Sequence, residues 1–343
     1  MIEIATPTAA DGPAITALFR DYPYRAFQQR RQGIDPAKLS AMLWEQTEKA
    51  MSQTTADFAL AASKGAGEGK GGKAGVVGLA GLVPDLWHAQ VFGKRMAKIQ
   101  PFLAYREPAA AGPALLQAVL DHAARRGYEH VSCRLDASDW DSIRLLESRG
   151  FYLVDGSQKL ARRLGPRPFE SAAGSDDLVI DEFRKGEEDR LAAIASRSHT
   201  TNHFYNDPAL GVEAGRRLFE EWVKRCCRGL ARHVFVARRL GSGGGGRGGE
   251  SEEPVGFVTY LGADALKKHL GLSLIVLDFV VVDAAWQGKG VGRWLLAETL
   301  NAIGAGYDWV ELRTSYNNYP ALALYHKLGF ETIASDVILH CVV

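Results

Sequence analysis

The 343-residue chain repeats itself at a nearly constant offset. The segment Val77-Gly78-Leu79 corresponds to Val255-Gly256-Phe257, 178 residues later. Near the end of each half, Gly150-Phe151 corresponds to Gly329-Phe330 at an offset of 179 residues. Because a stretch of this length can bury a complete core of its own, the repeat predicts two similar modules in tandem.

The boundary between the modules is marked by composition. A Gly-Pro-Arg-Pro sequence begins at residue 165, and the residues after it show no strong helical or strand periodicity. We therefore predict domains over residues 1–165 and 178–343, joined by a linker over residues 166–177. Two glycine-rich tracts, residues 64–75 and 241–249, precede equivalent strands in the two halves and predict flexible loops.

A strand, a glycine-rich turn and a helix follow one another in the second half. Residues 277–282 are apolar and mostly β-branched, which predicts a strand. Gln287, Gly290 and Gly292 then form a Q-x-x-G-x-G pattern, and apolar residues recur at helical spacing from Leu296 onward. This order points backbone N–H groups and the positive helix end at an anion such as a pyrophosphate. The segment matches neither the dinucleotide pattern G-x-G-x-x-G nor the P-loop pattern, which favours coenzyme A as the ligand.

A second motif follows a predicted strand at residues 309–314. Residues 318–330 read N-x-x-A-x-x-L-Y-x-K-x-G-F. The two motifs, in this order and spacing, resemble the GNAT superfamily of N-acetyltransferases. The resemblance implies an α/β (α+β) fold class with two tandem GNAT-like domains. Each domain would have a mixed, mostly antiparallel central sheet flanked by helices, and acetyl-CoA would be the cosubstrate.

The resemblance also implies how the coenzyme is held. The strand would separate from its neighbour and bind the pantetheine arm through its backbone, while the turn would bind the pyrophosphate. Asn318 would contact the arm, although an asparagine placed before Pro320 also suits the start of a helix. The predicted coenzyme-binding residues are Val280, Val281, Val282, Gln287, Gly288, Lys289, Gly290, Val291, Gly292, Arg293 and Asn318.

Catalysis in this superfamily is a direct attack of an amine on the thioester, which requires an acid and a base. Tyr325 would protonate the departing thiolate, although its spacing in the motif also suits a core tyrosine. A base is needed because an alkyl amine, with a reference pKa of about 10.4, arrives protonated at neutral pH. Asp278, Glu311 and His203 are candidates, and strand carboxylates also occur as purely structural groups. The sequence leaves this choice open.

The first half lacks the residues that this chemistry needs. Pro108, Ala111 and Pro113 stand where the second half has the glutamine and two glycines of the turn, and Leu146 stands at the tyrosine position. Proline has no N–H to offer a phosphate. We therefore predict that the domain over residues 1–165 is a degenerate, non-catalytic scaffold.

Two further segments resemble the dTDP-fucosamine acetyltransferase family: residues 87–99 and residues 203–208. The second would lie on the acceptor side, with His203 and Tyr205 as acceptor residues, although that family commonly has an arginine where this chain has His203. The predicted function is acetyl-CoA-dependent transfer to a primary amine of a small molecule, with a nucleotide-linked amino sugar as one candidate. The alternatives are a non-catalytic acetyl-CoA sensor and a protein or peptide N-acetyltransferase.

Composition excludes several other classes of function. The formal net charge is +1, so no strong field attracts nucleic acid or an anionic membrane. The four cysteines lack metal-ligand spacing, and no apolar run is long enough to span a bilayer. We therefore predict a cytoplasmic protein with reduced thiols, no metal, no nucleic-acid partner and no membrane partner. The sequence does not indicate an oligomeric state.

Overall fold

The computed structural model describes residues 1–53, 55–63, 75–165, 168–170, 177–198, 202–241 and 252–343. Most of the two predicted glycine-rich loops and of the predicted linker lies outside these residues. The chain divides into two compact units. Unit 1 contains Met1–Ser157, Asn206–Ala209 and Ile333–Val343, and unit 2 contains Gln158–Tyr205 and Leu210–Thr332.

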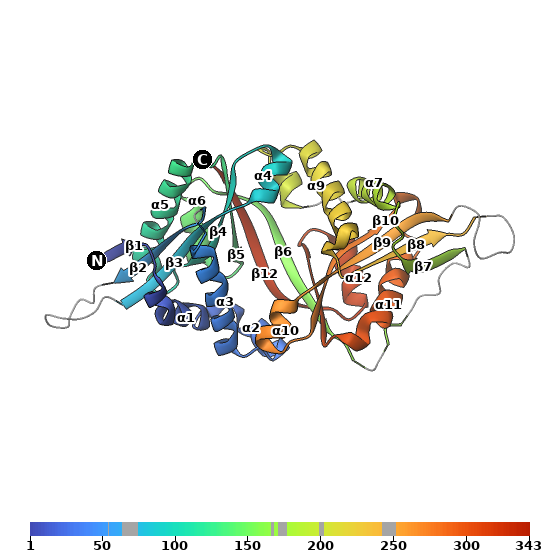
Figure 1. Cartoon of the computed structure of the whole chain (residues 1–343), viewed down its shortest axis with the longest axis horizontal. Coiled ribbons are helices and arrows are strands. Elements are labelled where there is room, and N and C mark those ends of the chain that lie inside the picture. Colours follow the sequence, from blue (N-terminus) through green and yellow to red (C-terminus); the bar gives the residue numbers. More distant parts are fainter. Residues whose placement is uncertain (54, 64–74, 166–167, 171–176, 199–201, 242–251) are drawn as a thin grey trace. The chain divides into compact units, whose positions relative to one another are not determined.

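Unit 1 is a mixed, mostly antiparallel sheet flanked by helices (Figure 1). Its strands, in sheet order, are β1 (Ile2–Ala5), β2 (Asp57–Ser63), β3 (Gly75–Pro84), β4 (Met96–Leu103), β5 (His130–Asp136) and β12 (Glu331–Val342). Only β4 and β5 pair in parallel. The helices are α1 (Gly12–Arg20), α2 (Ala26–Gln32), α3 (Pro36–Met51), α4 (Leu86–Phe92), α5 (Pro108–Arg126) and α6 (Trp140–Glu147).

Strand periodicity separates the two cores of unit 1. On β2, Ala59 and Ala61 pack with α5, whereas Phe58 and Leu60 pack with α1. Successive side chains of a strand point to opposite faces, so this uninterrupted apolar strand supplies both cores. Two helical layers therefore cover the two faces of the sheet.

Unit 2 repeats this arrangement (Figure 1). Its strands, in sheet order, are β11 (Trp309–Ser315), β10 (Leu274–Val282), β9 (Glu253–Gly262), β8 (His233–Arg239) and β7 (Leu178–Glu182). The helices are α7 (Glu188–Ser198), α8 (His203–Asn206, whose last residue belongs to unit 1), α9 (Val212–Arg225), α10 (Asp264–Leu270), α11 (Val291–Ile303) and α12 (Tyr319–Lys327). No helix in the described part of the chain has the length and apolar character needed to cross a membrane.

The two parallel ladders confirm the tandem repeat. In unit 1, Met96–Ile99 pairs with His130–Cys133, and in unit 2, Leu274–Leu277 pairs with Trp309–Leu312. Each ladder stops after these residues, although β4 and β10 continue along their antiparallel neighbours β3 and β9. The predicted fold class of two similar modules with mixed, mostly antiparallel sheets is therefore confirmed.

The compact units differ from the predicted domain boundaries at the last strand of each repeat. Strand β12 belongs to the second repeat in sequence, but Asp336–Val342 pairs antiparallel with His130–Asp136 of β5 in unit 1. Strand β6 (Tyr152–Arg163) contributes residues to both units. The alternation of apolar and polar side chains predicts which face of a strand is buried, but it does not predict the neighbouring strand. The sequence repeat therefore did not reveal this exchange.

Packing of β12 in the core of unit 1 can be tested by truncating one side chain. Leu339 is completely buried in that core, and Val342 of the same strand is 58% exposed. We expect Leu339→Ala to lower the free energy of unfolding by about 2–5 kcal/mol. The control Val342→Ala should change it by less than about 0.5 kcal/mol. Urea unfolding followed by circular dichroism measures both, and equal small effects would contradict the observed packing of β12.

Candidate functional site

The predicted glycine-rich turn lies at the N-terminus of α11. Gly288 and Gly290 have φ angles of +73° and +82°, in the left-handed region that favours glycine. Gly290 is also the N-cap residue of α11 and has no side chain to accept hydrogen bonds from the first-turn N–H groups. The helix therefore begins with free donors and a partial positive charge, as an anion site requires.

Two basic side chains flank this turn. The Nζ atom of Lys289 lies 4.9 Å from the ring centre of Trp286. The Nε atom of Arg293, in the first turn of α11, is buried and has no hydrogen-bond partner among the described residues. A buried donor without a partner costs free energy, so a bound anion would stabilise this guanidinium.

The strand before the turn separates from its parallel neighbour, as predicted. The ladder between β10 and β11 ends at Leu277 and Leu312, whereas β10 stays paired with β9 as far as Val282. Gln287, predicted to bind the pyrophosphate, donates from Nε2 to the Val282 carbonyl at 2.9 Å. Its side chain therefore fastens the turn to the end of the strand.

A β-bulge lies where the two strands separate. The register of β10 against β9 passes from Leu277 directly to Phe279, which leaves Asp278 as the extra residue. The bulge changes which face the following side chains occupy: Leu277 packs in the core with α11, whereas Phe279 and Val281 pack in the core with α7 and α9. Bulges of this kind re-aim side chains next to functional sites.

The carboxyl group of Asp278 is held in an environment that favours the neutral acid. Its Oδ2 atom accepts hydrogen bonds from Thr259 Oγ1 at 3.3 Å and from Cys226 Sγ at 3.5 Å. Burial raises the pKa of Asp278 to about 6, against the opposing effect of hydrogen bonds from Cys226, Thr259 and Trp222. A carboxyl group with such a pKa accepts and releases protons close to neutral pH.

The other candidate carboxylate has a different environment. Glu311 on β11 is 5% exposed, and its Oε2 atom lies 2.7 Å from Nζ of Lys159. The ammonium group neutralises the Glu311 carboxylate. Removing one partner of a buried pair is strongly destabilising, and this pairing distinguishes Glu311 from Asp278.

The second motif places Asn318 and Tyr325 at the two ends of α12. Asn318 occupies the N-cap position, but its side chain donates from Nδ2 to Thr314 Oγ1 at 3.0 Å and makes no capping hydrogen bond. Tyr325 is 8% exposed, and burial raises the pKa of its phenol above the ordinary value. The Tyr325 hydroxyl therefore stays protonated at neutral pH.

The predicted acceptor residues lie on α8. The ring of Tyr205 stacks on Phe219 with ring centres 5.7 Å apart, and its hydroxyl is buried without a hydrogen-bond partner among the described residues. Tyr205 shares a cluster of aromatic and apolar side chains with Trp222 and Phe279, the neighbours of Asp278. The ring of His203 packs against that of Phe204, with centres 3.9 Å apart.

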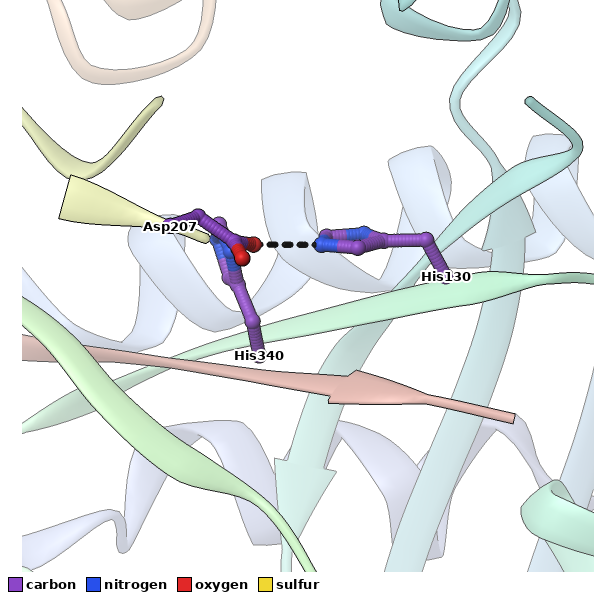
Figure 2. Close-up of side chains that lie close together, drawn as sticks. All are labelled: His130, Asp207 and His340. Carbon is purple, nitrogen blue, oxygen red and sulfur yellow. Dashed lines mark hydrogen bonds and ion pairs between the residues drawn. The ribbon is translucent and has the colours of Figure 1, made fainter. Parts of the chain in front are cut away.

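Several residues of this site were not identified from the sequence. Thr259, Cys226 and Trp222 reach Asp278 from β9, from η3 (Cys226–Leu230) and from α9. No short motif links them, and a polar residue in the apolar strand β9 was the only available signal. Among the described residues, His130, Asp207 and His340 of unit 1 bring potential metal-ligating atoms within 4.8 Å of one another (Figure 2). They come from distant segments, so their spacing also gave no signal.

Comparison with known families identifies the segment that contains the turn. Residues 230–332 match the family model of the acetyltransferase (GNAT) domain. The chain carries a GNAT acetyltransferase domain. The match extends from Leu230, the last residue of η3, to the beginning of β12 and includes the glycine turn, Asp278 and Tyr325. This match supports an acetyltransferase activity for this segment.

Several curated relatives align with a longer part of this chain than the family model does. The mycothiol acetyltransferase of Saccharomonospora viridis is 28% identical over 78% of this chain and 80% of its own length. The dTDP-fucosamine acetyltransferase of Escherichia coli is 24% identical over 59% of this chain and 77% of its own length. The spore coat polysaccharide biosynthesis protein SpsD of Bacillus subtilis is 23% identical over 62% of this chain, and the match spans 66% of that relative.

Solved structures share the fold over the whole chain. A GCN5-related N-acetyltransferase from Sphaerobacter thermophilus has a TM-score of 0.61 and 18% identity, with 99% of this chain and 95% of that chain covered. A tandem GNAT protein from the clavulanic acid biosynthesis pathway has a TM-score of 0.54 and 14% identity, covering 100% of this chain and 98% of that one. At this identity the likeness concerns the fold alone, and it supports the tandem architecture.

The turn can be tested with a matched pair of substitutions. We expect Gly290→Glu to weaken acetyl-CoA binding at least about 100-fold, because a carboxylate beside a pyrophosphate costs several kcal/mol. The control is Ala109→Glu, an exposed position in the first turn of α5 in unit 1, which should leave binding unchanged. Isothermal titration calorimetry measures both dissociation constants. Equal losses would mean that unit 1 also binds the coenzyme.

Proposed function

We propose that unit 2 transfers an acetyl group from acetyl-CoA directly to a primary amine of a small molecule. The observation that carries this proposal is the start of α11. The free N–H groups of the first helical turn, which follows Gly290, belong to the same turn as the buried, unpartnered Nε atom of Arg293. This combination suits a pyrophosphate.

The same position in unit 1 provides the contrast. Helix α5 begins at Pro108, so helical backbone occupies the positions that form the turn in unit 2. Ala111, at the position of Gly290, is completely buried in the core, and Pro113 lies inside the helix. Gln100 and Leu146 stand at the positions of Asp278 and Tyr325. We infer that unit 1 is a non-catalytic scaffold.

Coenzyme binding would use the edge of β10 that β11 leaves free. An extended pantetheine arm would lie beside Val280, Val281 and Val282 and exchange hydrogen bonds with their backbone, as an added strand does. An N–H group of this edge would also meet the oxyanion of the tetrahedral intermediate. The pyrophosphate would be bound by Gly288, Lys289, Gly290, Val291, Gly292 and Arg293, with Gln287 holding the turn and Asn318 contacting the arm.

Asp278 is our proposed general base. Its carboxyl group has a pKa of about 6, close to neutral pH, whereas the Glu311 carboxylate is already paired with Lys159. The base would accept a proton from the acceptor ammonium, either directly or through one water molecule. The free amine then attacks the thioester carbonyl and forms the new C–N bond. As the C–S bond breaks, Tyr325 would donate its proton to the departing thiolate of coenzyme A. Its phenolate would then regain a proton from the nitrogen of the new amide, directly or through water.

The acceptor is proposed to be a small molecule, bound near Tyr205 and His203. Two relatives that align with more than half of this chain are named for acetylation of mycothiol and of dTDP-fucosamine. A nucleotide-linked amino sugar remains one candidate. The alternative of a coenzyme sensor is less well supported, because unit 2 keeps both Tyr325 and Asp278, which binding alone does not need.

We further propose a cytoplasmic location. All four cysteines, Cys133, Cys226, Cys227 and Cys341, are free thiols in the structure. Free thiols agree with a reducing compartment, where disulfides are rare.

The proposal is tested by measuring thiol release from acetyl-CoA with a panel of amines. The panel contains nucleotide-linked amino sugars, polyamines, amino acids, aminoglycosides and short peptides. We expect turnover with at least one small amine that exceeds turnover with every peptide. Preference for peptides would favour the protein N-acetyltransferase alternative, and tight acetyl-CoA binding without turnover would favour the sensor.

The acid role of Tyr325 predicts a loss of turnover without a loss of binding. We expect Tyr325→Phe to lower kcat about 100-fold, the usual contribution of a general acid, while the dissociation constant of acetyl-CoA stays within about twofold. The control Tyr307→Phe makes the same chemical change at a partly exposed position of unit 2. Steady-state kinetics and calorimetry measure both quantities. An unchanged kcat would remove Tyr325 from the mechanism.

The base role of Asp278 predicts a pH dependence. Because the carboxylate is the active form, kcat/KM for the acceptor should rise as Asp278 loses its proton at a pH of about 6. Above that pH, ionisation of Asp278 should cause no further rise. Asp278→Asn should lower kcat/KM by about 10²–10⁴-fold and remove this acid limb. Glu311→Gln should keep the limb. A pH profile of Asp278→Asn that retains the limb would assign it to another group.

A further inference from the structure

A buried carboxylate in unit 1 holds a short stretch of chain next to the acceptor segment. Residues Asn206–Ala209 belong to unit 1, although the residues on either side of them belong to unit 2. The stretch follows Tyr205 directly and leaves α8 without entering another helix or strand. Two of its side chains hold the stretch in unit 1. Asn206 donates from Nδ2 to the Val154 carbonyl at 2.9 Å, and the side chain of Asp207 is buried, with 1% exposure.

The Asp207 carboxylate accepts four hydrogen bonds. Its Oδ2 atom accepts from Nε2 of His130 at 2.8 Å and from Nδ1 of His340 at 2.5 Å (Figure 2). Its Oδ1 atom accepts from the Tyr152 hydroxyl and from the backbone N–H of Ala209, each at 2.8 Å. Burial opposes the negative charge, but hydrogen bonds from His130, His340, Ala209 and Tyr152 hold the pKa of Asp207 well below its ordinary value. The group is therefore a fully satisfied anion.

The exchange of the last strands assembles these donors. In the antiparallel ladder of β5 with β12, His130 pairs with Val342 and Ser132 pairs with His340. The two histidines are thus diagonal neighbours on one sheet face, with ring centres 4.6 Å apart. Without β12 in unit 1, the carboxylate would lose one of its two imidazole donors.

The distances favour hydrogen bonds over a metal ion. Zinc bonds of about 2.0–2.1 Å place the ligand atoms of a tetrahedral site roughly 3.3 Å apart. The two carboxylate–imidazole contacts, at 2.8 and 2.5 Å, are shorter and lie in the hydrogen-bond range. In the tautomer that places the His130 ring proton on Nε2, the unpartnered Nδ1 atom carries a lone pair, so that tautomer leaves no buried donor unsatisfied.

We propose that Asp207, through its hydrogen bonds to His130 and His340, is a positioning residue that fixes the acceptor segment His203–Tyr205 for the acetyl transfer in unit 2. This inference rests on the proposed function. Tyr205 is one peptide bond from the anchored stretch and presents a buried hydroxyl without a partner in the described part of the chain. The acceptor segment is thereby restrained through the peptide bond that joins Tyr205 to Asn206.

The first test does not depend on an acceptor. Asp207→Asn removes the negative charge and replaces one acceptor oxygen with an NH2 donor, so the amide cannot accept all four hydrogen bonds. We expect backbone amides of Phe204 and Tyr205 to exchange hydrogen at least about tenfold faster in this variant. The control is Asp139→Asn, the same change at another carboxylate of unit 1 that is 1% exposed; Asp139 caps α6 by accepting from the Ser142 N–H, and asparagine is an equally good cap. Unchanged exchange in Asp207→Asn would overturn the anchor, whether or not the enzyme is active.

The second test separates positioning from overall stability. With an amine that the wild-type protein acetylates, Asp207→Asn should raise KM for the acceptor at least about tenfold and leave KM for acetyl-CoA within about twofold. His340→Leu, which removes a donor, should do the same. His340→Asn keeps a donor close to the Nδ1 position and should restore acceptor KM to near the wild-type value.

The outcomes are distinguishable. Faster exchange together with an unchanged acceptor KM would show an anchor without a role in acceptor binding and would overturn the proposal. Faster exchange in a protein that acetylates no amine would contradict the proposed function and leave the anchor standing. The metal alternative is checked with zinc and cobalt: one tightly bound ion per chain, lost in Asp207→Asn, would replace the hydrogen-bonded anchor with a metal site.

Discussion

The site depends on the point at which β10 and β11 stop pairing. The parallel ladder between β10 and β11 stops at Leu277, and the bulge at Asp278 follows immediately. Ending the ladder frees a backbone edge, which is the only kind of surface to which an extended amide chain can add with strand-like hydrogen bonds. The bulge then turns Phe279 and Val281 toward α7 and α9 and leaves Asp278 beside Thr259 and Cys226. The end of the ladder therefore provides the free edge, and the adjacent bulge sets the position of the Asp278 carboxyl group.

Unit 1 has separated strands of the same kind but lacks the glycine turn. Its ladder between β4 and β5 also ends early, at Ile99, and its register also shifts, between Ala80 and Leu82 of β3. What differs is the following helix. Helix α5 starts at Pro108, whereas α11 starts only after the two left-handed glycines Gly288 and Gly290. The anion site is thus a local property of the turn, placed on a framework that both units share.

The motifs allowed the central part of unit 2 to be predicted because its function depends on local geometry. The left-handed φ angles of Gly288 and Gly290 and the helix start are encoded within a few residues, and so the turn was identified from the sequence. The surroundings of Asp278 were not, because Thr259 and Cys226 come from other segments and their contact depends on packing. The pairing of β12 with β5 was missed for a related reason: an apolar strand fits the open edge of either repeat, and periodicity does not select between them.

The exchange of β12 also builds a buried polar cluster in unit 1, the repeat without the glycine turn. A unit without the glycine-rich turn would be expected to have a purely structural role. In this chain, however, β5 and β12 place His130 and His340 on one face, and their rings hold a carboxylate that follows the acceptor segment in sequence. A buried anion with four donors tolerates little displacement, because each lost hydrogen bond leaves charge uncompensated in a medium of low polarity. The hydrogen bonds of Asn206 and Asp207 therefore restrict the chain directly after Tyr205.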